Sequence, residues 1–166
     1  MQTGNESRKL TTTEIAALPA GLVAAVDIAG VELVGRHHPL SRLSRTFRGY
    51  SLILVRGRRI FWPGLRDDFS RDALQMSVLA HELVHVWQYA DGMTLLSYLA
   101  RDLIGRLGSY FYRIVPGKSY VAYGYEQQAA MVEDWMRLDA GMFAHYSRTG
   151  IDKAALEAIV PFLGGR

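Results

Sequence analysis

Hydrophobic and polar positions alternate with two different periods along this chain, and together they predict both helices and strands. The run Thr11-Thr12-Thr13-Glu14 places a hydroxyl group at a helix start and a carboxylate in the first turn, so we expect a helix over residues 13–26. Short apolar runs predict three strands, at residues 31–34, 51–55 and 59–62. The last two are separated by a short turn that contains Gly57, which predicts a hairpin. The order of these elements, followed by helical patterns, predicts an α+β fold.

The most informative segment is a long apolar run that begins after Asp72 and reads LAHELVHVW over residues 79–87. A helix that is apolar nearly all round is a buried one. Within it, His81 and His85 lie one helical turn apart, with Glu82 beside them. Burying two imidazoles and a carboxylate is costly unless something satisfies them, and a metal ion does so directly. Two neutral imidazole nitrogens at this spacing suit Zn²⁺, and Glu82 is placed to accept a proton from zinc-bound water. A pair of core histidines held by ordinary hydrogen bonds is the alternative.

Catalytic zinc sites need a third protein ligand, and four residues are candidates: Asp91, Glu126, Asp134 and His145. A metzincin site would continue from His85 through a glycine that allows a sharp turn, but Gln88 stands at that position. We therefore favour Glu126, which opens a second helical pattern over residues 126–136. The small residue Ala130 follows one turn later and would let two helices approach closely.

Two motifs carry a resemblance to a known family. The run HELVHVWQ over residues 81–88 and the run YGYEQQA over residues 123–129 resemble the small zincin-like Vgr-related proteins. These are kin to the metallopeptidase-like domains associated with bacterial contractile injection and type VI secretion systems. The resemblance extends over about residues 10–142.

The resemblance implies a zincin-like fold of the gluzincin type, in which a small twisted sheet with antiparallel pairing precedes the HExxH helix and a second, glutamate-bearing helix. It implies that His81, His85 and Glu126 hold zinc and that Glu82 is the catalytic base. Many gluzincins carry an aspartate four residues after the ligand glutamate, where this chain has Ala130. A carboxylate that orients a ligand histidine must therefore come from elsewhere or be absent.

Two functions follow as expectations. One is a zinc metallopeptidase that hydrolyses a peptide or protein substrate; the other is a zinc-binding module with a binding or assembly role, whose partner is a component of a secretion system. A peptidase also needs a donor to the oxyanion. The candidates near the second helix are Tyr120, Tyr123, Tyr125 and His145, and we expect Tyr123 because it lies just ahead of Glu126.

Composition agrees with one domain over residues 1–166, of which we expect residues 1–10 to be flexible. The net charge is only +3 and the arginines are dispersed, so nucleic acid is not an expected partner. The chain has no cysteine, so it offers neither disulfides nor thiolate ligands. We expect no transmembrane segment, and the polar residues 1–13 do not read as a signal peptide. The expected location is therefore cytoplasmic before any specialised export.

The connection between the two metal-binding helices, residues 93–117, is longer than a direct link requires. An apolar stripe predicts an amphipathic helix within it, formed by Leu95, Leu96, Leu99, Leu103 and Ile104. Three interpretations stay open: packing on the core, a partner or membrane surface, or a lid over the zinc cleft. The aromatic residues that follow, Tyr110, Phe111 and Tyr112, could line a substrate cleft or belong to the core.

Overall fold

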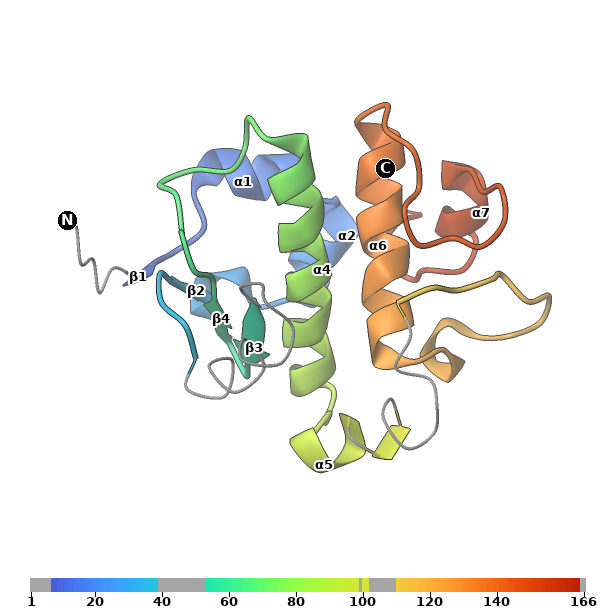
Figure 1. Ribbon diagram of the computed structural model, residues 1–166, viewed down its shortest axis with the longest axis horizontal. Helices are drawn as coiled ribbons and strands as arrows, with labels where there is room; N and C mark the ends of the chain where they lie inside the picture. The colour runs from blue at the N-terminus through green and yellow to red at the C-terminus, as the bar shows by residue number, and fades with distance from the viewer. Residues whose placement is uncertain (1–6, 39–52, 99, 102–109, 165–166) are drawn as a thin grey trace.

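The computed structural model describes residues 7–38, 53–98, 100–101 and 110–164 (Figure 1). Its four strands are β1 (Ser7–Arg8), β2 (Glu32–Val34), β3 (Leu54–Arg56) and β4 (Arg59–Phe61). They form a mixed sheet in the order β1-β2-β4-β3, in which β2 and β4 are parallel and the other two pairs are antiparallel. The architecture is therefore α+β.

The predicted hairpin is confirmed by β3 and β4, which pair from Leu54 opposite Phe61 to Arg56 opposite Arg59. Its turn consists of Gly57 and Arg58, and Gly57 has a φ of 59°, which glycine adopts at little cost. Residues 51 and 52 of the predicted first arm lie outside the described residues. The strand predicted at 31–34 is present as β2, whereas β1 falls within residues 1–10, where we expected flexibility.

The single helix predicted over residues 13–26 is wrong. The chain forms α1 (Thr12–Ala17) and α2 (Ala20–Ala25) instead. Pro19 lacks an N–H group and disfavours helical geometry in the residue before it, and Leu18 is accordingly extended with a ψ of 156°. The predicted start is confirmed, because the Thr11 side chain accepts from the Glu14 N–H and the Glu14 side chain accepts from the Thr11 N–H.

Glu14 also anchors this region to the rest of the fold. Its fully buried carboxylate accepts two hydrogen bonds from the Arg8 guanidinium, at 2.7 and 2.8 Å, and one from the Phe69 N–H at 2.9 Å. Burial alone would raise the pKa of Glu14, but the bonds from Arg8, Thr11 and Phe69 hold that pKa below its ordinary value. The charged side chain of Glu14 thus joins β1, α1 and the loop that contains Phe69.

Two long helices dominate the structure. The first, α4 (Ala73–Ala90), begins at the predicted cap Asp72, whose side chain accepts from the Gln75 N–H. The second, α6 (Tyr125–Asp139), packs antiparallel against α4, and the sheet contacts α4 through β3 (Figure 1). The shorter elements are η1 (Ile28–Gly30), α5 (Leu95–Tyr98), η3 (Tyr120–Ala122) and α7 (Lys153–Glu157).

The prediction that α4 is a buried helix is confirmed, because Leu79, Ala80, Leu83 and Val84 are all inaccessible to solvent. The amphipathic helix predicted between α4 and α6 is present only in part, as the short α5. Leu95 and Leu96 are 48% and 77% exposed, so they do not pack on the core, and residues 99 and 102–109 lie outside the described residues. Within the described ranges, no helix has both the length and the apolar character needed to cross a bilayer.

Candidate metal centre

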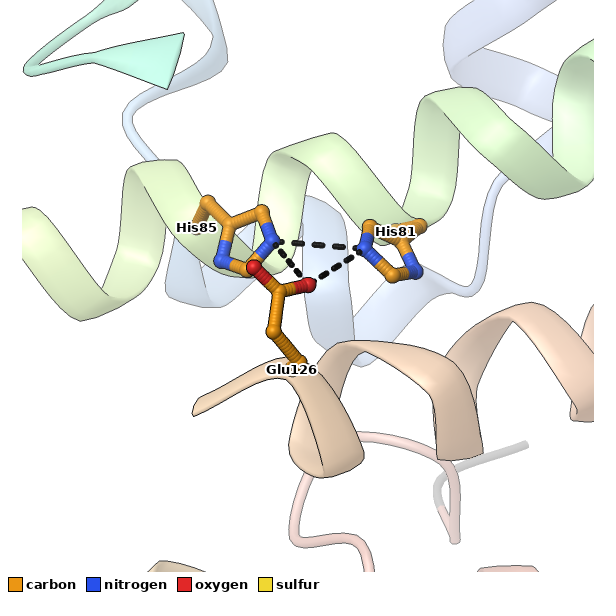
Figure 2. A group of neighbouring side chains, drawn as sticks. All are labelled: His81, His85 and Glu126. Carbon is orange, nitrogen blue, oxygen red and sulfur yellow. Dashed lines mark hydrogen bonds and ion pairs between the residues drawn. The ribbon is translucent and has the colours of Figure 1, made fainter. Parts of the chain in front are cut away.

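His81, His85 and Glu126 meet between α4 and α6. The two histidines project from neighbouring turns of α4, and Glu126 reaches them from the first turn of α6 (Figure 2). The Nε2 atoms of the histidines are 3.3 Å apart, and Glu126 Oε2 lies 3.3 Å from each of them. All three side chains are buried. The structure thus brings together the three residues favoured as ligands from the sequence.

These three atoms form a triangle whose edges suit a small tetrahedral metal ion. Metal–ligand bonds of about 2.0–2.1 Å place the ligand atoms of a tetrahedron about 3.3–3.4 Å apart. The edges of 3.3 Å between the two nitrogens and the carboxylate oxygen agree with that spacing. A group of this kind could hold a metal ion through three ligands and leave a fourth position open.

Each histidine is oriented by a second residue. His81 Nδ1 lies 3.0 Å from Glu133 Oε2, and His85 Nδ1 lies 2.8 Å from Gln88 Oε1. Both partners can act as hydrogen-bond acceptors, so they favour a proton on Nδ1 of each histidine, and a neutral histidine of that tautomer would have its Nε2 lone pair available to a metal. Ala130 has no carboxylate with which to orient a ligand histidine. Glu133, one helical turn after Ala130 in α6, takes that role.

Gln88 is held in this role by its own hydrogen bonds. Its Nε2 donates to the Tyr125 carbonyl at 3.0 Å and to Gln128 Oε1 at 3.1 Å, which leaves Oε1 facing His85. Gln128 in turn donates to the Tyr123 carbonyl. Gln88, which stands where a metzincin has glycine, thus continues α4 and connects it to the start of α6.

Glu133 is held in a similar way on the other side of the site. Its Oε1 accepts from Arg137 Nη2 at 2.8 Å and from Arg137 Nε at 3.2 Å. Burial would raise the pKa of Glu133, but His81 and Arg137 outweigh burial and lower it. The ring of Tyr110 stacks on His81 at 5.8 Å between centroids and covers this end of the site.

The charges of the cluster are strongly coupled. Burial opposes the charged forms of His81 and His85, but nearby carboxylates outweigh it, raising the pKa of His81 to about 10 and that of His85 as well. Burial likewise opposes the charge of Glu126, yet the two histidines hold its pKa well below the ordinary value. Burial raises the pKa of Glu82. The site therefore favours positive charge at its centre, which either protons or a metal cation can supply.

A cavity of about 270 Å³ opens onto the three ligands. Glu82 lines it, and so does β3, one of the two edge strands of the described sheet. Tyr110 also lines this cavity and Phe111 is exposed, whereas Tyr112 is buried. Of these three consecutive aromatic residues, the first therefore lies in the cavity wall, the second at the surface and the third in the core.

The other three ligand candidates do not join the cluster. Asp91 is exposed at the C-terminal end of α4, and the side chain of His145 is exposed. Asp134 is fully buried but accepts from the Tyr112 hydroxyl and from three backbone N–H groups, those of His145, Tyr146 and Ser147. Its carboxylate therefore fixes the loop after α6.

Tyr123, our candidate for the oxyanion, is not among the residues that line the cavity. Its side chain is buried, its hydroxyl accepts from the Val115 N–H at 2.9 Å, and Lys118 lies over its ring. The hydroxyl that does reach the ligands belongs to Tyr98 of α5, which donates to Glu126 Oε1 at 2.7 Å. Sequence reasoning missed Tyr98, and the unusual length of the connection between α4 and α6 was the one signal that pointed to this segment.

The fold and site define an α+β protein with a buried His-His-Glu cluster at the base of a cavity. No family model matches the chain. Over 74 residues it is 36% identical to the type VI secretion system spike protein VgrG2b of Pseudomonas aeruginosa. That match covers 41% of this chain and 7% of the relative, so the chain corresponds to only a small part of that protein.

The solved structure of the effector domain of Pseudomonas aeruginosa VgrG2b has a similar fold. The TM-score is 0.65 at 24% sequence identity, and the match covers 94% of this chain and 83% of that domain. Comparison of sequences and comparison of folds thus lead independently to VgrG2b. The relation to the type VI secretion proteins that we expected from the two motifs is supported.

Proposed function

We propose that this chain is a zinc-dependent metallopeptidase with a zincin-like fold, and that it acts in connection with a type VI secretion system. The observation that carries the proposal is the triangle of His81 Nε2, His85 Nε2 and Glu126 Oε2, with edges of 3.3 Å, at the base of a cavity that Glu82 also lines. A site that only stabilised the fold would need the ligands but no base beside them.

Zinc bound by these three side chains would polarise a peptide carbonyl and lower the pKa of a water molecule. Glu82 is placed to act as the general base and acid: it would take a proton from a water molecule activated in this way and return it to the leaving amine. Burial raises the pKa of Glu82 above its ordinary value, a direction that suits a group that must both take and return a proton. Glu133 and Gln88 keep the two imidazoles in the tautomer that leaves Nε2 available.

The substrate we propose is an extended peptide bound along β3. Leu54, Val55 and Arg56 of this strand line the cavity, and β3 is an edge strand of the described sheet. A peptide can add to such an edge through backbone hydrogen bonds. This arrangement would bring a carbonyl group of the peptide towards the ligands and Glu82.

The proposed link to type VI secretion rests on the similarity to VgrG2b and to its effector domain. By this proposal a component of the secretion apparatus is a partner of the chain, and a peptide or protein is its substrate. The alternative role, a zinc-binding assembly module, leaves the position of Glu82 in the cavity wall without an explanation.

The test is cleavage of a broad library of quenched fluorescent peptides by the zinc-loaded protein. We expect cleavage that a zinc chelator stops, and we expect Glu82→Gln to bind one zinc ion per chain but to cleave roughly 100- to 10,000-fold more slowly, as expected for loss of general base catalysis. Glu157→Gln, on α7 outside the cavity, makes the same chemical change as a control. Equal cleavage by Glu82→Gln and the unaltered chain would contradict the proposal.

A further inference from the structure

Tyr98 contacts the carboxylate of Glu126 on the side opposite to the two histidines. Oε2 of Glu126 faces both Nε2 atoms, whereas Oε1 accepts the hydrogen bond of 2.7 Å from the Tyr98 hydroxyl. An O–H···O⁻ bond of this length is charge-assisted and is among the stronger hydrogen bonds in proteins. The two oxygens of Glu126 are therefore inequivalent in this structure.

From this contact we propose that Tyr98 is a positioning residue that restricts Glu126 to binding the metal through a single oxygen. The inference rests on the proposed function, because it concerns the same metal site. A carboxylate can bind a metal through one oxygen or through both. Binding through both would raise the coordination number to five and crowd the fourth position, which a hydrolytic site needs for water or substrate. Because Oε1 accepts the hydrogen bond from the Tyr98 hydroxyl, it is held away from the metal.

The position of Tyr98 is fixed by the short segment that carries it. Thr94 and Ser97 cap α5 reciprocally, since each backbone N–H donates to the other side-chain hydroxyl. The ring of Tyr98 stacks on Tyr125 of α6 at 6.3 Å with an interplanar angle of 20°. The backbone of α5 and the stacked ring therefore together fix where the Tyr98 hydroxyl meets Glu126.

Arg101 fastens the same segment to α6. Its Nη2 donates to the carbonyls of Val121 and Tyr123, directly before α6, and its guanidinium lies 4.6 Å from the ring centroid of Tyr125. The connection between the two metal-binding helices is thus held against the helix that supplies Glu126. In the described part of this connection, the extra length serves to bring a hydroxyl to the third ligand.

The test is the coordination number of cobalt(II) in the full chain, compared between the unaltered protein and Tyr98→Phe. Phenylalanine keeps the ring that stacks on Tyr125 and removes only the hydroxyl. We expect the unaltered protein to give the intense visible absorption of four-coordinate cobalt. In Tyr98→Phe we expect at least a twofold weaker band, typical of five-coordinate cobalt, because both oxygens of Glu126 then bind. Circular dichroism of the metal-free variant checks that it remains folded.

Tyr89→Phe is the matched control for the spectrum. Tyr89 also lines the cavity, but no hydrogen bond joins its hydroxyl to Glu126. We expect its cobalt spectrum to equal that of the unaltered protein. If the unaltered protein binds cobalt and Tyr98→Phe gives the same spectrum, the inference about Tyr98 is wrong while the metal site stands. If the unaltered protein binds no cobalt, both the site and the inference are overturned.

Discussion

Replacing Glu133 by glutamine should weaken zinc binding without touching a ligand. Glu133 Oε2 lies 3.0 Å from His81 Nδ1, and Glu133 is almost fully buried. Glutamine has the same shape and can still present an oxygen to His81, but it carries no charge. A hydrogen bond to a charged group contributes about 1.5–3 kcal/mol, and a neutral one about 1 kcal/mol. The difference of about 1–2 kcal/mol corresponds to a roughly 5- to 30-fold rise in the zinc Kd.

The assay is competition for zinc between the protein and a chromogenic chelator at constant pH. Glu157→Gln is the control, because it removes a carboxylate that accepts from Trp135 and lies outside the cavity. Circular dichroism of the metal-free protein checks that Glu133→Gln remains folded although Arg137 loses its charged partner. A Kd within twofold of the unaltered value in a folded variant would refute the claim that Glu133 orients His81 for the metal.

Three further changes test other parts of the structure. Gln88→Leu removes the acceptor of His85 Nδ1 and should raise the zinc Kd roughly 10- to 100-fold by chelator competition; an unchanged Kd would show that His85 needs no such partner. Glu14 has a lowered pKa, so its stabilisation is present above the unfolded value of about 4.5 and is lost as pH falls through the folded pKa. Urea unfolding should therefore show Glu14→Gln less stable than the unaltered chain at pH 7, with a difference that shrinks as the pH falls below about 4.5; a difference that does not shrink would contradict this. Asp134→Ala leaves buried donors unsatisfied and should lower the free energy of unfolding by about 2–4 kcal/mol while the zinc Kd changes little; a large loss of zinc would return Asp134 to the candidate ligands.

The features that follow from local spacing could be predicted from the sequence. The placement of His81 and His85 on one face of a buried helix depends on residues four apart, and the cap at Asp72 depends on a side chain next to the helix start. The choice of Glu126 needed only a second helix with a carboxylate in its first turn. These arguments require no knowledge of how the helices pack.

The residues that orient the ligands could not be predicted in this way. Glu133 reaches His81 only because α6 packs antiparallel on α4, which brings the third turn of α6 beside the earlier histidine. Tyr98 reaches Glu126 across 28 positions of sequence, and the apolar stripe of its segment does not indicate where that segment packs. The error at Pro19 is different, since the local rule for the residue before proline already predicted a break between α1 and α2.

The central claim is that His81, His85 and Glu126 together hold zinc, and anomalous X-ray diffraction tests it most directly. Crystals of the protein grown with zinc should be measured on both sides of the zinc absorption edge. We expect one strong anomalous peak about 2.0–2.2 Å from His81 Nε2, His85 Nε2 and Glu126 Oε2. Crystals without a peak at this position, or with zinc held instead by Asp91 or His145, would contradict the account.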